Sequence, residues 1–238
     1  MAYANSTIIK YIRDMKALID GYTFAIENET ALKVAISYGN RKIGRVMNVS
    51  TAPMFTCGGN CKYCKNLCYD VKACLQYSNV RVARARNTAL SRKARAFFFE
   101  QIDVAMTRRR RNKYFRWHVA GDIQDADYLA RMIENARKHA DFKIWTYTKQ
   151  YSIVNEYVRT HGGSRAAAIP ANLTIMFSEW RGLPMDNPYG FPEFRVVFKD
   201  DAIKPDPAKV YYCPGNCDIC KENGRGCING ETTYANEH

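Results

Sequence analysis

The cysteines of this chain gather in two groups that share one spacing. Five of the nine lie between Cys57 and Cys74, the other four lie between Cys213 and Cys227, and none lies between the groups. Each group opens with the pattern C-x-x-x-C-x-x-C and carries Gly-Asn directly before its second cysteine. Cysteines kept only for packing would be scattered along the chain. The grouping therefore predicts two loops that bind metal or perform thiol chemistry.

All nine cysteines are candidate metal ligands. They are Cys57, Cys61, Cys64, Cys68 and Cys74 in the first group and Cys213, Cys217, Cys220 and Cys227 in the second. A [4Fe–4S] cluster takes four thiolates, whereas zinc prefers paired C-x-x-C knuckles closed into a tetrahedron. We expect a [4Fe–4S] cluster in the first group, where either Cys68 or Cys74 is spare. In the second group a second cluster and zinc both remain open.

Length and composition limit the class of protein. The 238 residues are 47% hydrophobic, enough for a sizeable core, and the net charge is +13. No apolar run approaches the roughly 20 residues of a membrane span, and charges interrupt the first 20 residues where a signal peptide would be apolar. We therefore expect an intracellular, cytoplasmic protein with no membrane partner. A reducing compartment favours metal ligation over disulfides. The oligomeric state cannot be predicted.

Hydrophobic periodicity predicts helices that alternate with strands. Helical spacing covers residues 6–20, 84–109, 125–140 and 151–160; strand patterns cover 31–37, 43–50, 114–122, 142–148, 173–180, 194–198 and 209–212. Alternation of this kind predicts an α/β fold with a mainly parallel sheet, open or curled into a partial barrel. We expect an N-terminal helix and strand in 1–42, a β/α core in 43–212 with the cysteine loop 57–74, and a cysteine-rich, metal-binding tail in 213–238.

Polar side chains follow the ends of several predicted strands, where α/β sheets bind their ligands. Alternation along 114–122 places Arg116 and His118 on the face opposite Phe115, Trp117 and Val119. We predict catalytic roles for His118 and Lys149. The alternative for His118 is a core histidine bonded to a neighbouring strand. The alternative for Asp122, at the exit of this strand, is a capping position of the next helix.

The loop Cys57-x-x-x-Cys61-x-Tyr63-Cys64, placed directly after a first core strand, resembles the radical S-adenosylmethionine superfamily. The resemblance implies that three cysteines hold a [4Fe–4S] cluster whose open iron binds the cofactor, with Tyr63 beside it. It also implies that Gly121 and Asp122 contact the amino group of the cofactor and that Ser178 or Glu179 contacts its ribose. The second group would then hold an auxiliary cluster.

A longer resemblance runs from Met47 to Tyr151. The segments MNVSTAPMFTC, CKNLCYD, NVRVARARN, FRWHVAGDIQDADYL and FKIWTYTKQY are similar to a family of phage-encoded and bacterial proteins called gene product eighty-eight. For a phage-encoded, viral protein the expected compartment is the host cytoplasm. That family's pattern stresses Cys64 and Cys68, so Cys68 is also a candidate ligand of the first cluster. Four cysteine ligands would leave no iron open.

Basic residues are dense from residue 81 to 113, and a nucleic-acid partner is one reading of them. An unbroken run consists of Arg108, Arg109, Arg110 and Arg111. Such density attracts phosphates, although a solvated helix face has the same composition. The leading hypothesis is a radical S-adenosylmethionine-type enzyme whose substrate, unknown, includes nucleic acid among the options. The first alternative is a non-catalytic or electron-transfer iron–sulfur protein that binds nucleic acid; the second is a zinc-stabilised nucleic-acid-binding protein.

Overall fold

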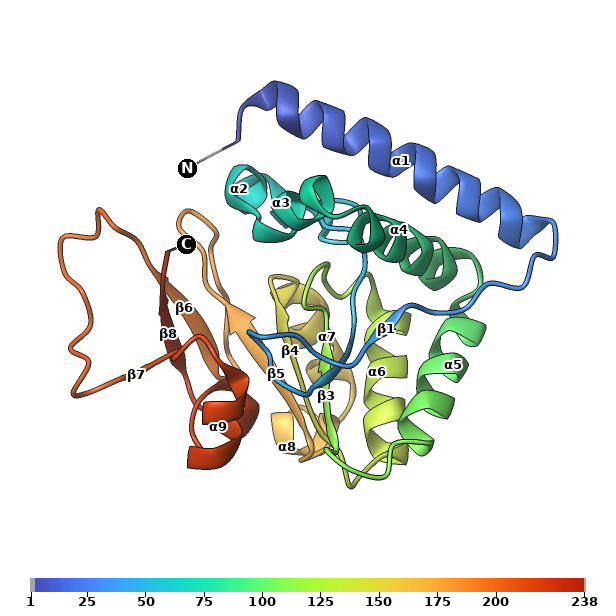
Figure 1. The fold of residues 1–238 in the computed structure, drawn as a ribbon. Helices are drawn as coiled ribbons and strands as arrows, with labels where there is room; N and C mark the ends of the chain where they lie inside the picture. Colours follow the sequence, from blue (N-terminus) through green and yellow to red (C-terminus); the bar gives the residue numbers. More distant parts are fainter. Residues whose placement is uncertain (1–2, 238) are drawn as a thin grey trace.

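The computed structural model describes residues 3–237, and its centre is one eight-stranded sheet (Figure 1). The strand order is β1-β2-β3-β4-β5-β6-β8-β7; only the β1–β2 pair is antiparallel. The strands are β1 (Ile36–Ser37), β2 (Met47–Val49), β3 (Tyr114–Trp117), β4 (Lys143–Thr148), β5 (Leu173–Ser178), β6 (Glu193–Val197), β7 (Tyr211–Tyr212) and β8 (Thr233–Asn236). The predicted α/β class with a mainly parallel sheet is confirmed.

From β2 to β6 the order of strands in the sheet follows their order in the chain, as in the wall of a barrel. Helices α5 (Arg95–Thr107), α6 (Ala126–Lys138), α7 (Tyr151–Thr160) and α8 (Arg165–Ala168) lie in the connections from β2 to β5, and a loop joins β5 to β6. The largest core cluster joins α5, α6 and α7 to one face of the sheet, through Phe98, Tyr128 and Val154 on the helices and Phe115 and Trp117 on β3. The opposite face is left for other contacts.

Three helices form a second layer beside the sheet: α1 (Asn5–Glu27), α3 (Tyr69–Gln76) and α4 (Ser78–Lys93) (Figure 1). Their core contains Tyr11 and Met15 of α1, Val71 of α3 and Ala85 of α4. The Tyr11 hydroxyl donates to the Pro53 carbonyl oxygen over 3.0 Å. This contact attaches the segment leading to the first cysteine group to the helical layer. The group itself continues through the short helix α2 (Cys61–Cys64).

Several predicted boundaries were wrong for local reasons. Helix α1 continues past Gly21 to Glu27, and the turn comes at Glu29, whose φ is +58°. The predicted helix 84–109 is two helices, because Ala94 leaves helical geometry at φ −133° and ψ 50°. The strand predicted for 114–122 ends at Trp117, since His118 has a φ of +55°. A left-handed residue ends the alternation of side chains along a strand.

The structure also contains elements that periodicity did not predict. They are α3, α8, α9 (Cys217–Asn223) and β8. No helix within residues 3–237 is long and apolar enough to cross a membrane. Strand β1 of the predicted segment 1–42 and β8 of the predicted tail 213–238 both belong to the one sheet; residues 1–2 and 238 of those segments lie outside the described part.

Candidate functional site

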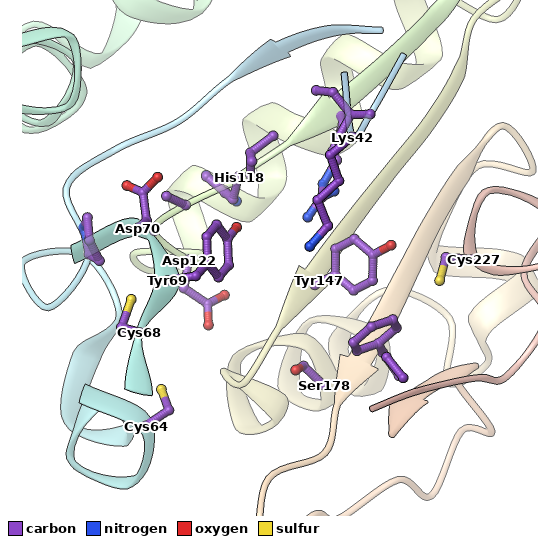
Figure 2. A pocket seen from close by; sticks show the side chains of 18 of the residues that line it. Lys42, Cys64, Cys68, Tyr69, Asp70, His118, Asp122, Tyr147, Ser178 and Cys227 are labelled. Atoms are coloured by element: carbon purple, nitrogen blue, oxygen red, sulfur yellow. The ribbon is translucent and has the colours of Figure 1, made fainter. Parts of the chain in front are cut away.

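One cavity of about 790 Å³ brings the two cysteine groups together. Eight of the nine cysteines line it: Cys57, Cys61, Cys64, Cys68, Cys213, Cys217, Cys220 and Cys227. In Figure 2, Cys64 and Cys68 lie on one side and Cys227 on the other, with Asp122, Ser178 and Tyr147 between them. The cavity covers the sheet face that α5–α7 leave open and reaches the carboxyl ends of β3, β4 and β5. Ligand sites of parallel sheets lie at these ends.

The first cysteine group is attached to the turn that follows β4. The Gln150 Nε2 donates to the Cys57 carbonyl oxygen, and the Asn60 Nδ2 donates to the Lys149 carbonyl oxygen, each over 2.5 Å. Gly58 lies against Gln150 with a φ of +60°, and a Cβ there would come within 2.7 Å of Gln150 Nε2. A glycine is therefore needed for this close approach. Gly58 and Asn60 thus both help to place the loop, whereas Gly59, the glycine of the shared Gly-Asn pair, has no close neighbour.

Gly121 and Asp122 form the turn after β3, on the cavity wall. Gly121 has a φ of +87°, and a Cβ would come within 2.0 Å of the Thr51 hydroxyl. The Asp122 carboxylate accepts from the Thr148 hydroxyl over 2.6 Å and from the Lys149 amide over 2.9 Å. Burial raises the pKa of Asp122 to about 6 despite these donors. Asp125, not Asp122, caps α6, so the capping alternative for Asp122 does not hold.

Lys149 and Ser178 meet in the cavity. The Lys149 ammonium donates to the Ser178 hydroxyl over 2.9 Å and lies 5.4 Å from the centre of the Trp180 ring. The other two residues implied by resemblance lie in different surroundings. Glu179 faces Arg195 of β6, with 3.6 Å between Oε2 and Nε. Tyr63 lies beside Gly182, where a Cβ would come within 3.8 Å of the tyrosine ring.

His118 lines the cavity but is bonded to the helical side of the sheet. Its Nε2 lies 3.0 Å from the Tyr128 hydroxyl of α6, and its Nδ1 lies 3.5 Å from the Thr146 hydroxyl. Burial and the nearby Arg116 lower the pKa of His118 to about 3, so the ring is neutral. The left-handed backbone at His118 also turns Val119 to the cavity, opposite to the face that alternation predicted. The contacts of the His118 ring with Tyr128 and with Thr146 of the neighbouring strand are close to the core-histidine alternative.

Cys74 is separated from the other cysteines of its group. It is fully buried in the core shared by α1, α3 and α4, and its Sγ lies 3.7 Å from Asp70 Oδ2. Asp70 in turn accepts two hydrogen bonds from Arg84, over 3.1 and 3.2 Å. Helix α3 was not predicted, and it carries this cysteine into the core. Cys74 therefore packs in the helical core, outside the cavity that the other four cysteines of its group line.

Cys68 caps α3 at the cavity wall. Burial raises the pKa of its thiol to about 11, although the backbone N–H groups of Asp70 and Val71 act in the opposite direction. Burial also raises the pKa values of Cys57 and Cys64. Metal binding removes these protons, because the thiolate is the ligand. The donor set of Cys57, Cys61, Cys64 and Cys68 thus fits a four-thiolate or three-thiolate iron–sulfur cluster in its chemistry.

The second cysteine group lies in the segment that connects β7 to β8 in the chain. It packs against the face of β4 that lines the cavity. Cys220 Sγ is 3.2 Å from the Tyr211 hydroxyl, and Cys227 is hydrogen bonded to Tyr147 and Thr233. Gly226 has a φ of +74°, and a Cβ there would come within 3.1 Å of the Cys220 sulfur. Among residues 3–237, no three His, Cys, Asp or Glu side chains are placed to hold a single metal ion.

The arginine run lies away from the cavity. Arg108, Arg110 and Arg111 are exposed between the end of α5 and the start of β3, whereas Asp122 follows the other end of that strand. Arg109 is half-buried, with its guanidinium 5.5 Å from the centre of the Tyr38 ring. Any contact that these arginines make with a phosphate backbone is therefore at the amino end of β3, away from the first cysteine group, whose loop is held at the carboxyl end of β4.

Sequence reasoning missed two residues of the cavity wall, Arg116 and Tyr147, and one residue that holds the cysteine loop, Gln150. Arg116 was placed on the correct face by alternation but was given no role, and Tyr147 and Gln150 were not singled out. Tyr147 follows the same period-two pattern on the adjacent strand, so the signal for it was present. The sequence contained no such signal for Gln150, because its hydrogen bond to Cys57 joins two residues that are 93 positions apart in the chain.

The model of the family described as Gene product 88 matches residues 23–210, more than half of the chain. The match includes the first cysteine group and ends before Cys213. No curated protein and no solved structure matches.

Proposed function

The chain belongs to the gene product 88 family, and from its cavity we propose that it is an iron–sulfur protein that binds and cleaves S-adenosylmethionine. The observation that carries the proposal is the meeting of the first cysteine group with Asp122 and Ser178 in one cavity. Cysteines alone would support several kinds of site. Their position beside a buried carboxylate at the ends of parallel strands favours a ligand-binding one.

The order of elements supports the same reading. The first cysteine group follows β2, the first strand of the parallel set; Asp122 follows β3, the second; and Ser178 ends β5, the fourth. Since each strand lies beside the next in chain order, the three groups come from one continuous edge of the sheet. This is the arrangement on which the resemblance to radical S-adenosylmethionine enzymes depends.

Cys57, Cys61 and Cys64 would hold the cluster. When bound by only three thiolates, a [4Fe–4S] cluster would supply an open iron for the amino and carboxylate groups of S-adenosylmethionine and, once reduced by dithionite, one electron that breaks the bond between sulfur and C5′. The products would be methionine and a 5′-deoxyadenosyl radical, which becomes 5′-deoxyadenosine by taking a hydrogen atom from a substrate or buffer molecule. Asp122 would accept a hydrogen bond from the amino group through its Oδ2, which accepts a hydrogen bond from the Lys149 amide and has a second lone pair. Ser178 would contact the ribose, with Lys149 holding its hydroxyl in position.

Cys68 supports a competing proposal. It lines the same cavity and follows Cys64 by four residues, so it would serve as a fourth ligand of a closed cluster. A closed cluster transfers electrons or stabilises the fold but has no site for the cofactor. Zinc in the second group remains a further proposal, because four cysteines meet its ligand requirement as well.

The deciding experiment measures both binding and cleavage. Anaerobically purified protein is analysed for iron, sulfide and zinc, titrated calorimetrically with S-adenosylmethionine, and reduced with dithionite to follow 5′-deoxyadenosine. We expect saturable binding and slow product formation by the wild type and by Cys74→Ala, which changes a thiol outside the cavity. The triple variant C57A/C61A/C64A should lose both. Stoichiometric zinc without iron in the wild type would exclude the proposal.

The arginine run supports a second candidate function, binding of nucleic acid. Three of its four side chains are exposed, and within residues 3–237 none of the four forms an ion pair with Asp or Glu. Free surface cations of this density bind phosphate backbones with strong salt dependence. Neutralising Arg108, Arg110 and Arg111 to Gln should lower affinity for single-stranded DNA and RNA and flatten the salt dependence. Unchanged binding would remove this candidate.

A further inference from the structure

Arg116 places a positive charge inside the cavity. It lies on β3 opposite Trp145 of β4, and both side chains line the cavity. Its guanidinium carbon lies 4.5 Å from the centre of the Tyr147 ring, a cation–π contact. Its Nε atom is buried and has no hydrogen-bond partner. The tyrosine face thus holds the side chain in place, and within residues 3–237 its Nε donor has no hydrogen-bond partner.

No carboxylate balances this charge. In the part of the chain from residue 3 to residue 237, Arg116 forms no ion pair with Asp or Glu. Tyr147, Tyr69, Cys217 and Cys227 raise its pKa against the effect of burial, and its own charge helps to lower the pKa values of Lys42 and His118. Arg84, by contrast, makes a two-bond pair with Asp70. Keeping an uncompensated charge away from water is costly. The missing counter-charge therefore points to an anion that enters the cavity.

The surroundings of Arg116 describe the rest of that ligand. Phe194 of β6 meets the Tyr147 ring edge-on, with 5.1 Å between ring centres, and Trp145 and Val196 continue the same wall. A volume of about 790 Å³ is within the range of pockets for small organic molecules. Aromatic and aliphatic walls favour an apolar body, and a guanidinium favours a carboxylate or phosphate at one end.

We propose that Arg116 binds the carboxylate or phosphate of a small organic anion whose apolar body lies against Tyr147 and Phe194. The anion site stands on the geometry of β3, β4 and β6 alone; a role for the anion as substrate would rest on the proposed S-adenosylmethionine chemistry. Asp122, proposed to hold the cofactor, lies beyond the carboxyl end of β3, so the two ligands would occupy neighbouring parts of one cavity.

The competing role for Arg116 is to offset negative thiolates of the second cysteine group. Burial raises the pKa values of Cys217 and Cys227, and the nearby Arg116 charge acts in the opposite direction. If this were its role, removing the charge would reduce the metal content and leave the binding of small anions unchanged. Metal content and anion affinity therefore separate the two roles.

The test is a calorimetric titration of the full, anaerobically purified chain with benzoate, phenyl phosphate and neutral benzamide, without S-adenosylmethionine. We expect one of the two anions to bind saturably and more tightly than benzamide, and the comparison of benzoate with phenyl phosphate identifies the head group. Arg116→Gln should weaken that anion about tenfold to hundredfold, the worth of hydrogen bonds to charged groups. Iron content should stay at the wild-type level.

Two further variants complete the test. Arg116→Lys keeps the charge without the planar fork, so it should weaken the anion less than Gln, and it serves if the Gln variant does not fold. Arg195→Gln removes an arginine between Phe194 and Val196 on β6 and should bind as the wild type does. Equal anion affinity in wild type and Arg116 variants, absence of saturable anion binding, or weaker binding that accompanies loss of iron would each overturn the inference. Cofactor binding, measured separately, fails or succeeds independently of these titrations.

Discussion

The two cysteine groups share their spacing but have different surroundings. In the first group, the nearby Asp122 carboxylate helps burial to raise the pKa values of the Cys57 and Cys64 thiols. Gln150 holds the loop of this group at the carboxyl ends of the parallel strands. Thiols of the second group lie near the Arg116 guanidinium and are hydrogen bonded by tyrosines. Only the first group lies within the range that matches the family. Equal spacing therefore does not imply equal chemistry.

The fourth cysteine of each group also has different surroundings. Cys68 follows its triplet by four residues and caps a helix, whereas Cys227 follows by seven, after Gly224 and Gly226 have turned the chain through left-handed conformations. The longer connection lets the last thiol of the second group approach from another direction. We expect the second site to be closed by all four cysteines and the first to use three.

The largest expected difference comes from removing each triplet. C57A/C61A/C64A and C213A/C217A/C220A should each lose roughly half of the iron if both groups hold clusters, since each removes one set of ligands. Only the first should abolish S-adenosylmethionine binding. Iron and sulfide assays with calorimetry on both variants check this. Loss of cofactor binding in the second variant alone would reverse the assignment of the two groups.

The fourth cysteines sharpen the comparison. Cys227→Ala should lose the metal of the second site, roughly half of the total where both sites hold iron, because a closed site needs four thiolates. Cys68→Ala should retain its iron and still bind S-adenosylmethionine. Metal analysis and absorption spectra of anaerobic protein measure both. A Cys68→Ala variant without the first cluster would show that this site, too, is closed.

A smaller effect is expected at the carboxylate that distinguishes the first group. Asp122→Asn should weaken S-adenosylmethionine about tenfold, because the charged acceptor for the amino group becomes neutral. Asp127→Asn, on the exposed face of α6, is the matched control and should bind normally. Calorimetry on the two variants gives the ratio. Equal affinities would remove Asp122 from the cofactor site while leaving the cluster assignments untouched.

The smallest effect concerns His118, which lies between the two groups. Its pKa is lowered to about 3 in the fold, so protonation favours the unfolded chain, and stability falls as the pH drops below about 6.5. Between pH 7.5 and 5.5 we expect a loss of about 1 kcal/mol from this residue. Asp122 acts in the opposite direction, because its pKa is raised to about 6 and its protonation favours the fold.

Comparing wild type with His118→Gln isolates the histidine from Asp122, which both proteins retain. Urea unfolding at several pH values should show that the difference in free energy of unfolding between the two proteins changes by about 1 kcal/mol between pH 7.5 and 5.5. A constant difference would mean that His118 is accessible to protons in the folded state, and the cavity would then be open to water at its base.

Much of the fold could be predicted because its information is local. Period-two and helical patterns identified β4 and α7 closely, and helix α7 matched the predicted range 151–160. Strand β8 was missed because Thr233–Asn236 is too short to show a pattern and is defined by its neighbours β6 and β7. The break at Ala94 and the left-handed His118 likewise reflect packing that no local pattern contains.

The candidate site could be predicted where the residue type itself indicates the chemistry. The cysteine groups, Asp122 and Lys149 were found because such residues at strand ends and at metal-ligand spacing are uncommon by chance. The exclusion of Cys74 required helix α3, which turns it into the core. The role proposed for Arg116 could not be predicted from the sequence, because it depends on which carboxylates lie near the side chain in the folded protein. No single segment of the sequence contains that information.

The place of β8 between β6 and β7 sets an order of events during synthesis. Strand β7 pairs with β8, which emerges about twenty residues later, so the second cysteine group is not assembled until β8 has left the ribosome. The first group and strands β2 to β5 precede it by most of the chain. Metal delivered to a nascent chain would therefore reach the first group before the second exists, and a shortened carboxyl end would affect the two groups unequally.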